Sequence, residues 1–197
     1  MRSFFPIFAS HIDLAHHYWK KSIHPGDTVI DATCGNGKDM LVLAKAAITE
    51  NRGRVFGLDI QQDAIEKSLS YLKENLPESA MQRVYLLQRS HAEFPEECGR
   101  GSVKLIVYNL GYLPNGNKSL TTTSSTTLVS VDNGLHFLEN GGVMSITCYP
   151  GHPEGKLEEE ALVAWLKNLN PKYYSVCHHR WLNRNDSPSL ILIQKSL

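Results

Sequence analysis

The chain has 197 residues, of which 42% are hydrophobic and 20% are charged, and its 20 basic residues balance its 20 acidic ones. This composition is ordinary for a globular protein long enough to bury a core, so we expect a single domain over residues 1–197. The zero net charge excludes the strongly basic class of nucleic-acid-binding proteins, although local Lys and Arg residues can still form a basic patch.

Metal, disulfide and membrane classes receive no support either. The four cysteines are scattered, without a Cys-x-x-Cys pair, at Cys34, Cys98, Cys148 and Cys177. This favours reduced thiols, and the adjacent histidines at 16–17 and 178–179 lack the spacing of metal ligands. The N-terminal segment has no uninterrupted apolar stretch and no small-residue cleavage site, so we expect neither a signal peptide nor a membrane span. A cytoplasmic location is expected, with an organelle's stroma or matrix left open.

Hydrophobic spacing predicts alternating helices and strands along the chain. Residues 8–23 have helical spacing, which predicts an N-terminal helix, within residues 1–24, that decorates the core. Strands are expected at residues 28–34, 53–60, 83–90, 103–114, 142–150, 172–182 and 187–195. Helices are expected at 38–48, 62–76 and 156–169, and a further one follows a Thr/Ser-rich loop and ends at Gly141–Gly142.

The alternation of strand and helix, about every 25–30 residues, predicts an α/β fold with a mostly parallel sheet and helices on both faces. Only residues 183–188 separate the last two strands, too few for a helix. These two strands should therefore be antiparallel. The sequence predicts a seven-stranded sheet with the last strand reversed.

A glycine turn between two acids follows the first strand, in the sequence Val-Ile-Asp-Ala-Thr-Cys-Gly-Asn-Gly-Lys-Asp of residues 29–39. A phosphate-binding P-loop requires Ser or Thr after the lysine, but Asp39 follows Lys38. A dinucleotide turn requires a third glycine, where Met40 stands. The two acids, Asp31 and Asp39, repel phosphates and suit a ligand with a positive charge and an amino group. S-adenosylmethionine has both.

The ends of the second and third strands extend this ligand site. Asp59 follows Gly37 by about 20 residues, the spacing at which an acid binds ribose hydroxyls. The alternative is that it caps the next helix, and both roles could hold together. Ser90 and His91 are expected near the adenine edge, and a surface-loop histidine is the alternative for His91. The predicted cofactor-binding residues are Asp31, Gly35, Asn36, Gly37, Asp39, Asp59, Ile60, Gln61, Ser90, His91 and Asn109.

The fourth strand ends in Tyr-Asn-Leu-Gly-Tyr-Leu-Pro, residues 108–114. Many methyltransferases that act on an amino nitrogen have Asn or Asp, two small or proline residues and an aromatic here, a pattern that Asn109 to Tyr112 resembles. The Asn109 side-chain oxygen and the Leu110 carbonyl could orient an amine, and Tyr112 offers a flat face for a base. Alternatively, Asn109 satisfies loop backbone groups and Gly111 serves a turn.

Two further loops carry candidate substrate residues. A rigid Pro/Gly loop follows the fifth strand and should turn Tyr149 and His152 toward the substrate. Arg180 and Arg184 could contact phosphates, although a solvated hairpin is the alternative. The predicted catalytic residues are Asn109, Tyr112 and His152, the last as a proton acceptor in competition with water. The predicted substrate-binding residues are Leu110, Gly111, Tyr112, Tyr149, His152, Arg180 and Arg184.

Five motifs together resemble a family of small proteins once grouped as rRNA methylases: Asp-Ala-Thr-Cys-Gly-Asn-Gly-Lys-Asp, Gly-Leu-Asp-Ile-Gln, Ser-His-Ala-Glu-Phe, Tyr-Asn-Leu-Gly-Tyr-Leu-Pro and Tyr-Pro-Gly-His-Pro-Glu-Gly. That family, of the MnmM type, is associated with methylation of 5-aminomethyl-2-thiouridine at the wobble position of tRNA. The resemblance implies a Rossmann-like class I methyltransferase fold, S-adenosyl-L-methionine as donor, and the tRNA anticodon region as partner. Asn117 departs from the family pattern, which has an acid there.

Other functions remain open at this stage. The acceptor could instead be rRNA or a small-molecule amine, and a non-catalytic nucleoside-binding module is a further alternative. A tRNA enzyme with no net charge must concentrate its cations locally, for which Lys20, Lys21, Arg180 and Arg184 are candidates. A homodimer would enlarge such a surface, although no symmetry can be read from the sequence.

Overall fold

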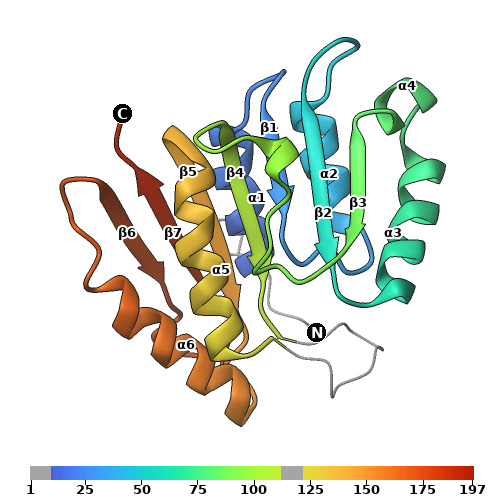
Figure 1. Ribbon diagram of the computed structural model, residues 1–197. Helices are drawn as coiled ribbons and strands as arrows, with labels where there is room; N and C mark the ends of the chain where they lie inside the picture. The colour runs from blue at the N-terminus through green and yellow to red at the C-terminus, as the bar shows by residue number, and fades with distance from the viewer. Residues whose placement is uncertain (1–9, 112–121) are drawn as a thin grey trace.

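The computed structural model describes residues 10–111 and 122–197. These residues form one sheet with helices on both faces (Figure 1). The strands are β1 (Thr28–Asp31), β2 (Arg54–Asp59), β3 (Val84–Gln88), β4 (Val103–Asn109), β5 (Leu138–Cys148), β6 (Tyr174–His179) and β7 (Ser189–Lys195). The helices are α1 (His11–Ser22), α2 (Lys38–Ala47), α3 (Gln62–Asn75), α4 (Glu78–Met81), α5 (Ser124–Phe137) and α6 (Pro153–Leu166), with a 3₁₀ turn at Glu96–Cys98.

The seven strands lie in the order β3-β2-β1-β4-β5-β7-β6. Strands β1 to β5 pair with one another in parallel, and β7 is antiparallel to both β5 and β6. Figure 1 shows the β7 arrow pointing opposite to the others. The predicted mostly parallel sheet with a reversed last strand is confirmed. The carboxyl ends of β1 to β5 and the connection between β6 and β7 therefore share one edge of the sheet.

The core is divided between the two faces of the sheet, because successive strand residues point to opposite sides. On β4, Leu105 and Val107 pack in the cluster that includes α1, α2 and α3. Ile106 and Tyr108 pack in the cluster that includes α5 and α6. β4 is buried on both faces, as expected for the centre of a parallel sheet.

Several predicted boundaries are wrong, including those on the two sides of β5. The helix expected to end at Gly141–Gly142 ends at Phe137, and β5 begins at Leu138, which pairs with Val103. The pairing register shifts between Val103 and Leu105, and a Cβ on Gly142 would lie 3.0 Å from the Val103 carbonyl. Leu138 thus keeps the apolar spacing of the preceding helix while already belonging to a strand. The last helix begins at Pro153, three residues before the predicted position, because His152 caps it.

The N-terminal helix is anchored in the core by Trp19. This side chain is 2% exposed, and its indole Nε1–H donates to Ser145 Oγ on β5 at 2.8 Å. Within the described ranges, no helix has the length and apolar character needed to cross a lipid bilayer.

Trp19→Phe should lower the free energy of unfolding by about 1–3 kcal/mol, because it removes packing volume and leaves Ser145 without its donor. Ser145→Ala should also destabilise, because it leaves the indole N–H buried without an acceptor. Chemical denaturation of both single variants and the double variant measures the coupling. Additive costs would contradict a direct interaction between the two side chains.

Candidate active site

The glycine turn lies at the carboxyl end of β1 and has the backbone that its glycines predict. Gly35 and Gly37 have φ values of 50° and 77°, in the left-handed region that favours glycine. A Cβ on Gly37 would lie 3.0 Å from the Cα of Ser68, so α3 packs closely on the turn. The Ser68 hydroxyl also donates to the Gly35 carbonyl at 2.8 Å. Asn36, between the glycines, is partly exposed.

Asp59 joins the glycine turn to the start of α3. Its Oδ2 accepts from the Gly35 amide at 3.1 Å, and its Oδ1 accepts from the Gln61 amide at 2.9 Å. The cap position of α3 belongs to Gln61, so the alternative that Asp59 caps the helix is wrong. Burial raises the pKa of Asp59, while the two backbone amides oppose that rise. Ile60, directly after the acid, is 47% exposed and adds an apolar surface to the edge.

Asp31 is a buried acid with an incomplete set of partners. It is 1% exposed, and its Oδ1 accepts from the Thr33 amide at 3.2 Å. Its Oδ2 has no hydrogen-bond partner among the described residues. Burial raises its pKa well above the usual value, and the charges of Asp39 and Asp59 add to the rise. Such an oxygen is suited to a cationic hydrogen-bond donor, which would favour the ionised form.

Asp39 connects three segments at this edge. Its Oδ1 accepts from His16 Nε2 of α1 at 2.8 Å, and its Oδ2 accepts from Asn109 Nδ2 at 2.8 Å. The Asn109 amide N–H donates to Thr33 Oγ1 at 2.7 Å. Because the Asn109 nitrogen faces Asp39, its Oδ1 faces away from Asp39 and can accept a hydrogen bond from a ligand. The sequence interpretation missed His16 and Thr33.

The chain on both sides of residues 112–121 is held together. The Gly111 amide donates to Thr122 Oγ1 at 2.8 Å, and the Thr122 amide donates to the Gly111 carbonyl at 3.1 Å. The Thr122 hydroxyl donates to Glu158 of α6 at 2.8 Å. Glu158 is 3% exposed, and burial raises its pKa. The backbone of buried Leu110 is held by its own amide, which donates to the Thr147 carbonyl at 2.9 Å. The predictions for Tyr112 and Asn117 lie outside the described residues.

Tyr149 and His152 lie on the loop after β5. Tyr149 Oη is 3.2 Å from His11 Nε2, and burial, assisted by the charge of Asp39, raises the pKa of Tyr149 to about 12. His152 Nδ1 accepts from the Gly155 amide at 3.1 Å as the cap of α6. The hydrogen of a neutral ring is then on Nε2, which lies 4.0 Å from the Cβ position of Gly111. This geometry favours a hydrogen-bond donor over a proton acceptor at His152.

The remaining predicted residues are distributed around this edge. His91 is 8% exposed, its carbonyl accepts from Ser130 Oγ at 2.7 Å, and burial lowers its pKa, so it is not a surface-loop histidine. Ser90 Oγ accepts from the Ala92 amide at 3.2 Å. Arg180 and Arg184 lie on the connection between β6 and β7.

A metal site finds no support in the part of the chain that the structure describes. No group of three or more His, Cys, Asp or Glu side chains there is arranged to hold an ion. The carboxylates of this edge instead accept from backbone amides, from an imidazole and from a side-chain amide. The edge therefore offers organic ligands a row of oxygen acceptors.

Asp31→Asn should stabilise the protein at neutral pH. Because the pKa of Asp31 is raised in the folded state, folding favours the protonated form, and stability falls as the pH rises from about 4 through the folded pKa. The substitution should raise the free energy of unfolding by about 1 kcal/mol at neutral pH, with a smaller gain in acid. Urea denaturation across the pH range measures this. Asp132→Asn, at an exposed position of α5, is the control, and a gain independent of pH would contradict the assignment.

Comparisons with known proteins place this arrangement in a family. The family model described as "Putative rRNA methylase" matches residues 55–195. The "tRNA (mnm(5)s(2)U34)-methyltransferase, chloroplastic" of Arabidopsis thaliana is 37% identical over 187 residues, which cover 93% of this chain and 68% of that protein.

Two solved structures are similar over nearly their whole length. A putative rRNA-methylase from Clostridium thermocellum has 35% identity and a TM-score of 0.87, over 94% of this chain and 97% of that one. A putative methyltransferase from Streptococcus mutans, crystallised in complex with SAH, has 28% identity and a TM-score of 0.80, over 93% and 97% of the two chains. The chain therefore belongs to the family that the matching model describes, the putative rRNA methylases.

Proposed function

We propose that this protein is an S-adenosylmethionine-dependent methyltransferase that acts on tRNA. Its acceptor is the amine of 5-aminomethyl-2-thiouridine at the wobble position, and its product is 5-methylaminomethyl-2-thiouridine. The Arabidopsis relative is named for methylation of this wobble nucleoside. The observation that carries the proposal is the Asn109 amide, oriented by Asp39, at the end of the strand next to the one that ends in the buried, incompletely paired Asp31 carboxyl. The relative is chloroplastic, and we expect this chain to act where its tRNA is modified, in the cytoplasm or an organelle.

The residues at the carboxyl edge fit the donor. Asp31 offers an oxygen without a described partner to an α-amino group, and Asp59 keeps acceptor capacity for ribose hydroxyls beside its two amide bonds. The exposed Ile60 side chain suits the face of an adenine ring. The bound donor supplies a methyl group on a positively charged sulfur. Three nearby carboxylates, Asp31, Asp39 and Asp59, attract a cation and repel a polyphosphate.

The acceptor amine must be neutral when it attacks, because its lone pair forms the new bond to carbon. An alkyl amine has a pKa of about 10, so most of it is protonated at neutral pH. Asn109 Oδ1 and the Leu110 carbonyl can accept its N–H groups and aim the lone pair, which is a positioning role. Since His152 Nδ1 accepts from the Gly155 amide, we assign proton removal to water. Tyr112 remains our predicted stacking partner for the uracil ring.

The direct test uses tRNA from a strain that lacks the modification enzyme, incubated with the protein and labelled S-adenosylmethionine. Mass spectrometry of the nucleosides should show loss of 5-aminomethyl-2-thiouridine and gain of its methylated product. Asn109→Ala should bind the donor normally by calorimetry and lose turnover by 100-fold or more, on the order of the loss expected for a misplaced reactant. Persistence of the unmethylated nucleoside, or label in rRNA instead, would overturn the proposed acceptor.

Asp39→Asn tests how Asn109 is oriented. An amide at position 39 can present a nitrogen to Asn109 and lose the preference for one orientation, so kcat should fall about tenfold, equivalent to about 1.4 kcal/mol. The acceptor KM should change little, and the donor Kd should rise by a smaller factor than kcat falls, because Asp31 and Asp59 keep two of the three carboxylates that attract the cationic donor. Lys38→Gln, on the exposed neighbouring position, is the matched control. A large loss of donor affinity with unchanged kcat would instead make Asp39 a donor-binding residue.

A further inference from the structure

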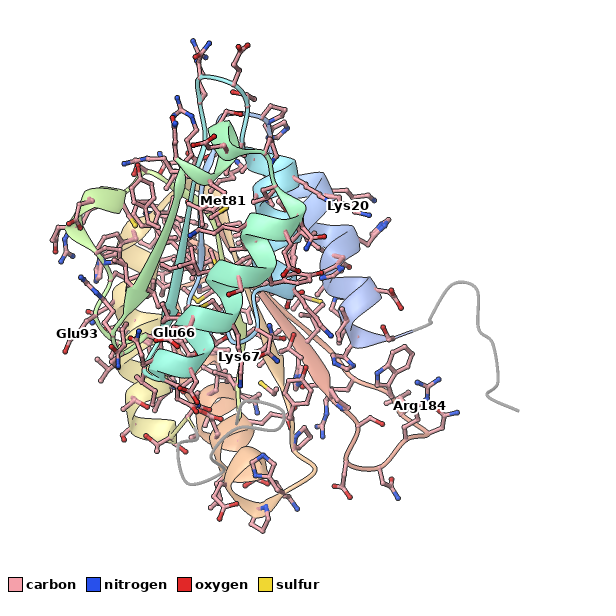
Figure 2. All side chains as sticks on the ribbon, turned by 90° about the vertical axis from the view of Figure 1, so that its right-hand side faces the viewer. Lys20, Glu66, Lys67, Met81, Glu93 and Arg184 are labelled. Atoms are coloured by element: carbon pink, nitrogen blue, oxygen red, sulfur yellow. The ribbon has the colours of Figure 1, made fainter. Side chains whose placement is uncertain are left out.

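A groove lies beside the candidate active site, between α6 and the connection from β6 to β7. Its volume is about 750 Å³. Pro150, directly after Tyr149 on the loop that follows β5, is among its lining residues, so the groove reaches the carboxyl edge of the sheet. Figure 2 shows Arg184 on this connection and Lys20 on α1 well apart from it, so these two cations named from the sequence do not share one patch.

Cations line both walls of this groove. Lys156 and Lys167 come from α6 and its end, and Arg180 and Arg184 come from the facing connection. The two lysines are separated by about 16 Å along the helix, at 1.5 Å per residue. A nucleic-acid strand bound along the groove would therefore have cations on both sides over the length of a few nucleotides.

Trp181 gives the groove an aromatic surface. It lines the groove on the side of the β6–β7 connection, and the guanidinium of Arg184 lies 4.3 Å from its ring centroid. An aromatic ring with an arginine stacked on it, beside further cations, is the combination with which proteins hold single-stranded nucleic acid.

The groove also contains acids, which argues against recognition by net charge alone. Glu159, Glu160 and Asp186 line it with the four cations. Glu159 is engaged, because it accepts from Ser189 Oγ at 2.6 Å and lies 3.1 Å from His178 Nε2, and the bond to His178 lowers its pKa. A groove with nearly balanced charge and an aromatic surface suits single-stranded nucleic acid, whose bases are accessible, better than a duplex, which presents mainly its backbone.

We propose that this groove binds the single-stranded RNA next to the methylated nucleotide. Trp181 stacks on a base of the anticodon loop, while Arg180 and Lys156 pair with the adjoining phosphates. The inference rests on the proposed tRNA substrate and adds the surface that holds it, separate from the donor site.

The test measures binding of an anticodon stem-loop RNA by fluorescence anisotropy, together with methyl-transfer kinetics. Trp181→Ala should weaken RNA binding and raise the RNA KM about tenfold, within the range for one stacked base, with kcat and donor Kd unchanged. Trp181→Phe should retain most of the affinity. Arg180→Gln should weaken binding and reduce its salt dependence by about one phosphate contact. Arg52→Gln, an exposed arginine before β2 at the opposite edge, is the control and should bind normally.

The two proposals fail in different ways. If the wild-type protein binds the stem-loop and Trp181→Ala does not, the groove is supported even where no methyl group is transferred. Normal binding by Trp181→Ala, Arg180→Gln and their double variant would overturn the groove while leaving the reaction intact. Equal affinity for a duplex of the same length, or no binding of the stem-loop by the wild type, would also overturn it.

Discussion

The Asp39 carboxylate holds together three segments that lie far apart in the chain. It accepts from His16 on α1 and from Asn109 at the end of β4, and it belongs to the first turn of α2. The positive end of the α2 dipole favours an anion at this position. One charge therefore docks the N-terminal helix, stabilises the start of α2 and selects the orientation of the Asn109 amide. The acceptor geometry consequently depends on α1, which contributes no residue to the glycine turn.

The same edge brings together carboxylates whose negative charge destabilises the protein when no ligand is bound. Asp31 is buried with one oxygen lacking a described partner, and the charges of Asp39 and Asp59 raise its pKa further. An edge of this kind stabilises a cationic ligand at the expense of the protein's own stability, a common trade at functional sites. The negative charge of this edge also explains why the glycine turn departs from phosphate-binding sequences. Without a third glycine and with acids on both sides, it suits a sulfonium and an ammonium.

Local sequence patterns predicted which strand ends form the candidate site. They missed most of the hydrogen bonds that connect these strand ends to other segments. The glycine turn and the end of β4 were found because each places distinctive residues at a strand end. His16 and His11 were missed, since helical spacing predicts α1 but not which strand ends it contacts. Leu138 was assigned to a helix because its apolar spacing continues that of α5, whereas its pairing with Val103 is a long-range property. The hydrogen bond from the Gly35 amide to Asp59 was missed for a similar reason, since it crosses from the first turn to β2.

A protein with no net charge can act on RNA if its acidic and basic residues are distributed differently between two surfaces, here the carboxyl edge of the sheet and the groove beside α6. The acidic edge repels phosphates and accepts cations and amines, whereas the adjacent groove presents four cations beside three acids. In the complex that we propose, a nucleotide that approaches both would be oriented by this division, because its phosphates would be favoured by the cations of the groove and its aminomethyl group would be favoured beside Asn109. Such an arrangement would discriminate against acceptors that bring a phosphate to the donor. The acidic edge would then contribute to the choice of the methylated atom, and the groove would contribute to binding.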